Sequence, residues 1–434
     1  MPLRLDSRRA DFTAAFAALV DIKREADENV DATVAGILDD VRKRGDQAII
    51  DHTRRLDGVA LTSETMRVTA AEIAAAKSQC AATTMEAVAL AAARIEDFHR
   101  RQLPQNLGYE DEVGVELGLR WNAIDAVGIY VPGGTAAYPS SVLMNAIPAR
   151  VAGVPRLAMV VPAPGGQLNP LILCAADIAG VTEVYRIGGA QAVGALAYGT
   201  ETIDPVDKIV GPGNAYVAAA KRRVFGVVGI DMIAGPSEIV VVADRDNDPA
   251  WIAADLLSQS EHDANAQAIL ISDDAVFAEQ VAQAAGQCVA TLPRADIARA
   301  SWEQYGAIIV VEELSRAAEL VNRLAPEHLE LAVANPDALL SKIRHAGAIF
   351  LGRYTPEAIG DYIAGPNHVL PTSRSARFSS GLGTLDFLKR TTLVRCSIES
   401  LGRIGPAAID LAEAEGLDAH ALSVAIRVNL PRCR

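Results

Sequence analysis

The sequence predicts an α/β fold in which helices cover both faces of parallel sheets, and three observations support this prediction. From residue 122 onward, short apolar segments alternate with helical segments of about 8–15 residues, the pattern of consecutive βαβ units. The alternation starts again at Glu238, so we expect two consecutive α/β units of similar size. The residues before position 100 show apolar positions at helical spacing, which predicts an N-terminal helical region.

Each expected element follows from its local pattern of apolar and turn residues. The N-terminal helices are expected over residues 11–26, 31–56 and 70–101, and the Gly-rich stretch 107–121 predicts an irregular or extended connection. In the first α/β unit, strands are expected over 123–131, 156–161, 183–187 and 208–210, and helices over 140–153, 170–178, 191–197 and 215–224. In the second unit, strands are expected over 238–243, 267–271, 307–311 and 348–351, and helices over 249–262, 274–284, 314–324 and 336–345.

The chain after Gly381 becomes a shorter, mixed tail. Residues 406–413 have a helical pattern, and residues 421–428 fit either a helix or a strand. The tail is too small to bury a core of its own, so we expect it to dock on another surface.

The composition narrows the class of protein. A length of 434 residues predicts about two to four domains. The 54 acidic residues exceed the 40 basic ones, which argues against nucleic acid or an anionic membrane as a partner. The one basic run, Lys221-Arg222-Arg223, is expected on a solvated helix face.

The sequence also predicts the cellular compartment of the protein. The five cysteines are scattered without a C-x-x-C pattern, which favours a reducing compartment over a disulfide framework. The N-terminus has no apolar segment typical of a signal peptide, and no run of about 18 apolar residues is present. We therefore expect a soluble, cytoplasmic protein.

Four short segments hold most of the reactive side chains. Four of the seven histidines lie in them, each near a carboxylate or a carboxamide. Imidazole with Asp, Glu or Gln is a ligand set for zinc or a similar divalent metal, and an adjacent Glu-His pair suits acid–base chemistry. The chain is therefore predicted to be a metal-dependent enzyme. The segments are Gln259-Ser260-Glu261-His262, Ala325-Pro326-Glu327-His328, Gly360-Asp361 with Asn367-His368, and 415–420 with Glu415 and His420.

Gln259 and His262 are three residues apart near the end of a helix that starts at Asp248-Pro249. This spacing puts both on one face, within reach of one ion. The alternative is that His262 only complements the negative end of the helix dipole.

Glu327-His328 follows Pro326, which disfavours helix at the preceding residue. The pair fits a general base, and a surface loop pair is the alternative. Asp361 lies in a loop rich in turn residues, and this position alone indicates a ligand site only weakly. Glu415 and His420 can share a site only through an irregular turn, and a solvated tail is the alternative.

Glycine-bearing turns follow several predicted strands of the first unit. Backbone N–H groups at such a turn suit phosphate or ribose binding, although the G-x-G-x-x-G fingerprint is absent and generic turns explain the pattern equally well. Ser237, at the junction of the two units, could bind a ligand or simply cap a turn. The turns are Gly133-Gly134-Thr135, Gly188-Gly189-Ala190-Gln191 and Gly211-Pro212-Gly213-Asn214.

These segments together resemble the histidinol dehydrogenase family, and the resemblance extends in order over essentially the whole chain. The matching phrases are VGIYVPGGTAAYPSSVLMNAIPA, YRIGGAQAVGALAYGTE, DKIVGPGNAYVAAAK, GIDMIAGPSEI, DLLSQSEHD, NRLAPEHLEL, GDYIAGPNHVLPT and EGLDAHALSVAIR. Each phrase is moderately specific, and all eight together are highly specific.

The resemblance implies an NAD-dependent, four-electron oxidation of L-histidinol to L-histidine through L-histidinaldehyde, the last steps of histidine biosynthesis. Zinc, one ion per subunit, would hold the substrate. His328 would act as general base, and Glu327 would activate water for the aldehyde step. The implied zinc ligands are Gln259, His262, Asp361 and His420. The implied substrate-binding residues are Ser237, Gln259, His262, His328, Asp361, Glu415 and His420. The implied NAD-binding residues are Tyr130, Gln191 and Asn214.

The resemblance also implies a homodimer in which the C-terminal tail, with Glu415 and His420, reaches the partner's site. The implied fold has two related Rossmann-like units, each an incomplete nucleotide-binding domain. The expected division is an N-terminal helical segment 1–27, a metal- and substrate-binding α/β domain 28–121 plus 237–380, an NAD-binding α/β domain 122–236 and a tail domain 381–434.

Three alternatives remain at this point. A family relative could oxidise another small diol or amino alcohol. A cysteine-dependent aldehyde dehydrogenase would need a thiolate nucleophile, but none of the cysteines lies in these motifs. A metal- and nucleotide-binding protein without turnover would not need Glu327 beside His328. The ligand set also accepts manganese or cobalt, and His368 has no role assigned.

Overall fold

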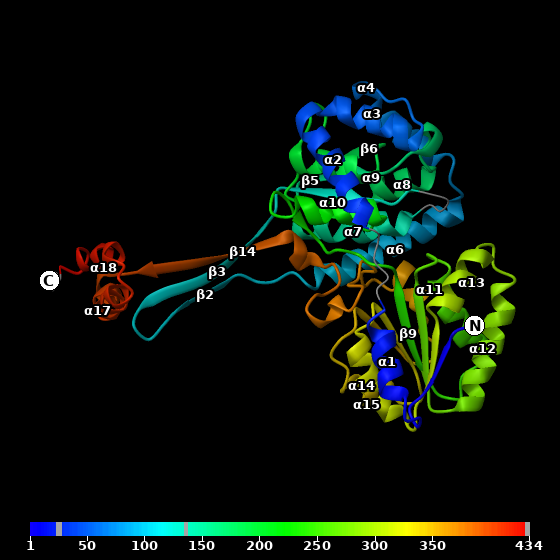
Figure 1. Cartoon of the computed structure of the whole chain (residues 1–434). Coiled ribbons are helices and arrows are strands. Elements are labelled where there is room, and N and C mark those ends of the chain that lie inside the picture. Colours follow the sequence, from blue (N-terminus) through cyan, green and yellow to red (C-terminus); the bar gives the residue numbers. More distant parts are fainter. Residues whose placement is uncertain (23–27, 134–137, 430–434) are drawn as a thin grey trace.

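The computed structural model describes residues 1–22, 28–133 and 138–429. It contains two α/β units, each built on a parallel sheet, and an antiparallel ribbon that projects away from both (Figure 1). Two predictions fall partly outside the described residues. Residues 134–137 include most of the first predicted glycine turn, and residues 23–27 include the end of the first predicted helix.

The first unit has a five-stranded parallel sheet in the order β6-β5-β4-β7-β8. Its strands are short and apolar, as expected for a sheet buried on both faces. Alternate residues point to opposite faces, so Val127 and Ile129 pack toward α7 and α8, while Ala126 and Tyr130 pack toward α9 and α10. The elements are β4 (Ala126–Tyr130), α7 (Pro139–Ala152), β5 (Arg156–Val160), α8 (Pro170–Ala179), β6 (Glu183–Tyr185), α9 (Gly189–Tyr198), β7 (Lys208–Val210), α10 (Ala215–Val224) and β8 (Gly229–Ile230).

The helices between residues 28 and 100 pack on this first unit, contrary to the expected grouping of 28–121 with 237–380. Apolar residues of α2 and α3 join the core on one face, and those of α5 and α6 join the core on the other. The expected helix 31–56 is divided at Gly45, whose φ of 52° favours glycine, and 70–101 is also two helices. The helices are α2 (Glu28–Arg44), α3 (Asp46–Asp57), α4 (Ser63–Met66), α5 (Ala70–Lys77) and α6 (Ala82–Arg100).

The second unit has a six-stranded parallel sheet in the order β1-β11-β10-β9-β12-β13. The N-terminal segment is therefore not only helical, because β1 forms one edge of this sheet and α1 packs on one of its faces. Counted from β4 in the first sheet and from β9 in the second, five strands of each sheet follow the doubly wound order 3-2-1-4-5. In the second sheet β1 adds a strand beside β11, which is not the position of the sixth strand of a complete dinucleotide-binding fold.

The elements of the second unit confirm the expected strands and add four elements that the sequence did not predict, strands β1 and β12 and helices α13 and α16. They are β1 (Leu3–Asp6), α1 (Phe12–Val20), β9 (Glu238–Ala243), α11 (Pro249–Ser260), β10 (Gln267–Ser272), α12 (Ala275–Val289), α13 (Ala295–Gln304), β11 (Ala307–Val310), α14 (Ala317–Leu324), β12 (His328–Ala332), α15 (Pro336–Leu340), β13 (Ala348–Leu351) and α16 (Glu357–Tyr362). Short 3₁₀ turns lie at Pro164–Gly166, Leu314–Arg316, Ser375–Arg377 and Thr384–Phe387.

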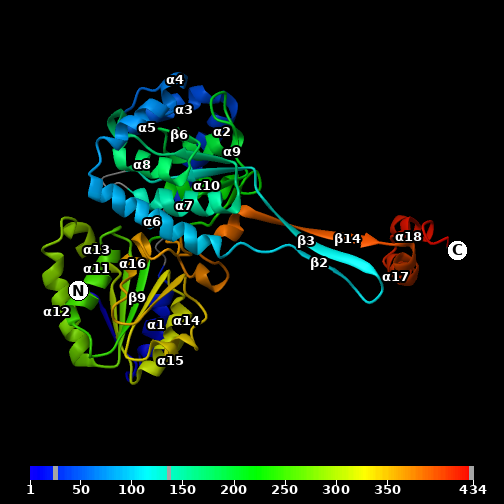
Figure 2. The ribbon, with the colours of Figure 1, turned by 180° about the vertical axis from the view of Figure 1, so that it is seen from behind.

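The expected connection 107–121 and the tail form one antiparallel ribbon. Strand β3 (Val115–Ala123) pairs with β2 (Leu107–Glu110) on one side and with β14 (Leu388–Cys396) on the other. At its end, α17 (Ile398–Ala414) packs against α18 (Asp418–Ala425). Seen from behind, the ribbon again extends away from both α/β units, so the helices at its tip stand apart from them (Figure 2).

The structure bears on two further expectations, one about membrane-spanning helices and one about the basic run at 221–223. No helix within the described ranges is long and apolar enough to cross a bilayer. The basic run at 221–223 is not wholly solvated, because the Lys221 side chain is only 3% exposed and pairs with the buried Asp231.

Candidate active site

The two predicted catalytic residues lie where the chain enters strand β12. Helix α14 ends at Leu324, and Ala325 adopts a left-handed conformation with φ 46° before Pro326. This turn directs Glu327 and His328 into the sheet, between β9 and β13, and both side chains are buried. The pair therefore lies at the amino ends of the strands of the second sheet.

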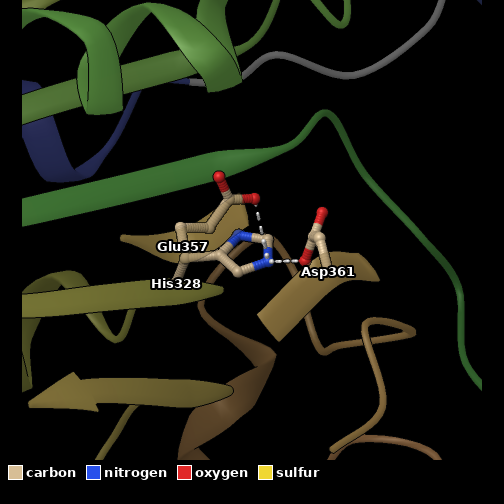
Figure 3. Close-up of side chains that lie close together, drawn as sticks. All are labelled: His328, Glu357 and Asp361. Carbon is tan, nitrogen blue, oxygen red and sulfur yellow. Dashed lines mark ion pairs between the residues drawn. The ribbon is translucent and has the colours of Figure 1, made fainter. Parts of the chain in front are cut away.

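The ring of His328 is held by its Nδ1 atom, which donates to the main-chain oxygen of Glu238 at 3.0 Å. A carbonyl oxygen can only accept, so this contact fixes the proton on Nδ1. Nε2 points toward two carboxylates, with Asp361 Oδ1 at 3.4 Å and Glu357 Oε1 at 3.8 Å (Figure 3). Nε2 is thus the ring atom available to a substrate.

Glu327 lies beside the same ring. Its Oε2 accepts the N–H of Glu238 at 2.9 Å and lies 3.7 Å from His328 Nδ1. Burial raises the pKa of Glu327 to about 7, although the neighbouring imidazole acts in the opposite direction. A carboxyl with a pKa near neutrality can act as a general base at physiological pH.

The surrounding carboxylates set the charge of the imidazole. Burial opposes the imidazolium form, but the carboxylates of Glu327 and Asp361 outweigh it and raise the pKa of His328 to about 10. Burial also opposes the charge on Asp361, yet the His328 imidazole holds the pKa of that carboxyl well below its usual range. Without a competing cation, His328 and Asp361 form an ion pair.

His328, Glu357 and Asp361 form a group that could hold a metal ion, with donor atoms all within 4.8 Å of one another. Asp361 belongs both to this group and to the ligand set expected from the sequence. Glu357 is a member that sequence reasoning missed, and its one available signal was a position directly after Pro356 at a helix start.

The environment of Glu357 is unusual for a carboxylate. Its backbone N–H donates to Glu330 Oε1 at 2.6 Å, and its Oε2 accepts from Ser258 Oγ at 3.0 Å. Burial and the nearby charge of Asp361 raise the pKa of Glu357 to about 8. These bonds hold the first turn of α16 against the sheet and so fix the direction of Glu357 and Asp361.

Gln259 and His262 come from the end of α11, which returns the chain to the amino edge of the sheet. Gln259 is 1% exposed, and neither its Oε1 nor its Nε2 atom has a hydrogen-bond partner among the described residues. A buried amide without partners is costly unless a ligand completes it, so Gln259 fits a metal-binding role. The helix ends at Ser260, and the exposed His262 follows it in a turn.

His368 supports the site from the loop after α16. Its Nδ1 donates to the backbone oxygen of Asp361 at 3.0 Å, while Asn367 Nδ2 donates to the oxygen of Met144 in the first unit at 2.6 Å. The loop thus ties the backbone at Asp361 to both units. Ser237 precedes β9 directly, and its backbone oxygen accepts the N–H of Gln267 at 2.9 Å.

Glu415 and His420 do not join these residues within one chain. Glu415 follows α17 as its C-cap, His420 lies in α18, and both residues are exposed. These two helices stand at the tip of the projecting ribbon (Figure 1).

The three predicted NAD-binding residues gather at the carboxyl edge of the first sheet. Tyr130 ends β4, and its hydroxyl accepts the N–H of Gly189 at 3.0 Å. Gln191 lies buried in the first turn of α9, with an unpartnered Oε1 in the described structure. Asn214 caps α10 by accepting the N–H groups of its first turn.

The chain is similar to known proteins of one family over nearly its whole length. The family model for histidinol dehydrogenase matches residues 21–428. Histidinol dehydrogenase of Rhodospirillum rubrum is 65% identical over 430 residues, and that of Rhizobium meliloti is 64% identical over 430 residues, each match covering 99% of both chains. The crystal structure of histidinol dehydrogenase from Elizabethkingia anophelis matches with a TM-score of 0.94 at 37% identity, covering 99% of this chain and 98% of that one. The chain therefore belongs to the histidinol dehydrogenase family.

Proposed function

We propose that this protein oxidises L-histidinol to L-histidine through L-histidinaldehyde, with NAD as the hydride acceptor in both steps. The observation that carries the proposal is the buried Glu327–His328 pair, whose free Nε2 atom faces a group of potential metal ligands. The family membership of the chain supports the same reaction.

Zinc fits the donor set, which consists of imidazole, carboxylate and amide groups without thiolates. The proposed ligands are Gln259, His262, Asp361 and, from a second copy of the chain, His420. The unpartnered amide of Gln259 supports this set. When bound, the ion would act as a Lewis acid toward the substrate and would offset the negative charge of Asp361.

In the first oxidation, the proposed role of His328 is to accept the alcohol proton at Nε2 as hydride leaves the carbinol carbon. The bond from Nδ1 to the Glu238 oxygen supports this role, because it fixes the tautomer with a free Nε2. Offsetting the charge on Asp361 would lower the pKa of His328 and favour its neutral, proton-accepting form.

In the second oxidation, the aldehyde must first be hydrated, because only the hydrate has a hydride to give. The proposed role of Glu327 is to take a proton from the attacking water, with His328 assisting again. The separation of 3.7 Å between Glu327 Oε2 and His328 Nδ1 supports this, since side chains facing opposite ways would have excluded a shared substrate. The burial of both groups favours a dry site that retains the aldehyde.

The proposed NAD site includes Tyr130, Gln191 and Asn214, and Ser237 and Glu415 are proposed to contact the substrate. The position of the three cofactor residues at the ends of adjacent parallel strands supports nucleotide binding, because such edges are the usual ligand sites of doubly wound sheets.

We further propose a homodimer in which the ribbon and tail of each chain dock on the other. Large apolar side chains on α17 and α18, among them Ile398, Leu411 and Leu422, are exposed in the single chain, which supports their burial against a partner. This exchange would bring Glu415 and His420 of the partner subunit to the zinc site, where one chain alone is incomplete.

The test is NADH formation from L-histidinol, followed at 340 nm with and without a chelator and added zinc. Activity that chelation abolishes and zinc restores is expected. Absence of NADH with metal-replete protein would contradict the assignment to histidinol and would redirect the search to other small amino alcohols and diols.

A further inference from the structure

The first α/β unit lacks the carboxylate that usually binds the ribose of a dinucleotide. In the common dinucleotide-binding fold, an Asp or Glu after the second strand accepts a hydrogen bond from the ribose 2′-hydroxyl. Here the segments after the first four strands of this unit, 131–138, 161–169, 186–191 and 211–214, contain neither Asp nor Glu, and the one acid directly after the fifth strand is Asp231. A ribose at this edge therefore needs an acceptor from elsewhere.

Asp57, the last residue of α3, comes from outside the unit and lies beside this edge. At the other end of α3, the N–H of Asp46 donates to Glu201 Oε2 at 2.8 Å, just beyond the end of α9. The two helices pack together, and α3 is about 16 Å long against about 14 Å for α9. Their antiparallel arrangement brings Asp57 to the start of α9, where Gly189 lies.

A second contact places the same stretch of chain near the end of the second strand. Val59 follows Asp57 by two residues, and its Cγ1 lies 3.9 Å from the position that a Cβ on Gly166 would occupy. Gly166 ends the 3₁₀ turn Pro164–Gly166, which follows β5, the second strand of the unit. Asp57 is thus close to the position where the fold normally carries its ribose carboxylate.

The carboxylate of Asp57 has hydrogen-bonding capacity that the described residues leave unfilled. Its Oδ2 atom is buried and has no hydrogen-bond partner in the described part of the chain, and burial raises the pKa of the carboxyl. Burial also raises the pKa of Tyr130 to about 12, and the negative charge of Asp57 adds to that rise, so the two residues are close enough to interact. A buried carboxylate oxygen without a donor is costly, which favours a ligand hydroxyl as its partner.

The other buried acid at this edge, Asp231, already has its hydrogen-bond partners within the protein. Asp231 pairs with Lys221 and accepts the N–H groups of Gly211 at 2.8 Å and Met232 at 2.6 Å. Lys221 in turn donates to the oxygen of Gly211 at 2.9 Å. This pair holds the glycine turn in place and has no oxygen to spare for a ribose.

We propose that Asp57 accepts a hydrogen bond from the 2′-hydroxyl of the adenosine ribose of NAD and thereby selects NAD over NADP. The inference rests on the proposed NAD-dependent function and names the residue that recognises the ribose. A 2′-phosphate would meet a carboxylate of like charge, so NADP is excluded both by repulsion and by loss of the hydrogen bond.

The test measures binding directly, by calorimetric titration of the zinc-loaded dimer with NAD and with NADP. Asp57→Asn keeps the shape and removes the charge, and Asp57→Ala removes the acceptor. Loss of a hydrogen bond to a charged group predicts NAD affinity lower by about tenfold or more, and a smaller preference for NAD over NADP. Asp51→Asn on the same helix is the matched control, because Asp51 is exposed and paired with Arg44.

Thermal unfolding separates recognition from structure. The raised pKa means that the ionised form of Asp57 is disfavoured in the folded protein at neutral pH, so Asp57→Asn is expected to raise the melting temperature while it weakens NAD binding. Unchanged NAD affinity in both Asp57 variants, or equal weakening of NAD and NADP, would overturn the inference. Wild-type protein that binds no NAD would instead contradict the proposed function itself.

Discussion

Asp361 Oδ1 lies 3.4 Å from His328 Nε2, the ring atom that is proposed to take the substrate proton. In this arrangement the carboxylate stabilises the imidazolium and keeps the proposed base protonated. A cation that engages Asp361 would release His328 for catalysis, so the same carboxylate connects metal binding to proton transfer.

Replacement of His328 tests its role as general base. We expect His328→Ala to lower kcat for both oxidation steps by about 10² to 10⁴, the usual contribution of a positioned acid–base group. NAD affinity should stay unchanged, since His328 belongs to the second unit. Steady-state kinetics and NAD titration measure the two quantities, and equal loss of both would indicate misfolding.

Glu327 should matter mainly in the second step. Its pKa of about 7 predicts that oxidation of the aldehyde falls as the pH decreases through 7, because the carboxyl becomes protonated and can no longer take a proton from water. Glu327→Gln should remove this decrease in rate at low pH and slow aldehyde oxidation about a hundredfold. Rates with L-histidinaldehyde supplied as substrate, measured from pH 5 to 9, check this. If the rate of Glu327→Gln still falls at low pH, the group that titrates is not Glu327.

Gln259→Leu and Glu357→Gln distinguish two possible metal positions. If zinc lies on Gln259, His262, Asp361 and His420, Gln259→Leu should lower zinc affinity about tenfold or more, while Glu357→Gln has a smaller effect. Equilibrium dialysis against competing chelators measures the affinity. The opposite ranking would place the ion on the group formed by His328, Glu357 and Asp361.

Mixed dimers test whether His420 acts in trans. Two variants that are each expected to lose both oxidation steps, His328→Ala and His420→Asn, are unfolded and refolded together. With random pairing, half of the dimers are mixed and each has one intact site, so about a quarter of the wild-type activity should return. Co-refolded variants that remain inactive, while wild type treated alike recovers, would show that each chain supplies its own His420.

The sequence predicted most strands of both units, because parallel strands buried on both faces appear as short apolar runs. It missed β12, whose sequence HLELA includes two buried polar residues. It also did not predict the ribbon as strands, since β2 and β14 are largely exposed, β3 is only partly buried, and none of them has a buried apolar face. The packing of α2 to α6 on the first unit could not be read from periodicity, which reveals a helix but not its neighbour.

Most of the candidate site was predicted from motifs, but its location in the fold was not. Ligands of doubly wound sheets usually lie at the carboxyl ends of the strands, where the proposed cofactor residues of the first unit also lie. Glu327 and His328 instead lie at the amino ends of the second sheet. Glu357 carried no motif and became visible only when α16 was folded beside His328. The relation between the two units that the resemblance implies stays a prediction, and the strand order shared by β4–β8 and β9–β13 supports it.

The most direct test of the account is the number of NADH molecules formed for each L-histidinol consumed by the zinc-loaded wild-type protein. Two NADH per substrate, with L-histidine as the product, is the result predicted by successive oxidations at one site. One NADH per substrate, with free aldehyde in solution, would contradict the role of Glu327 in hydrating a retained intermediate.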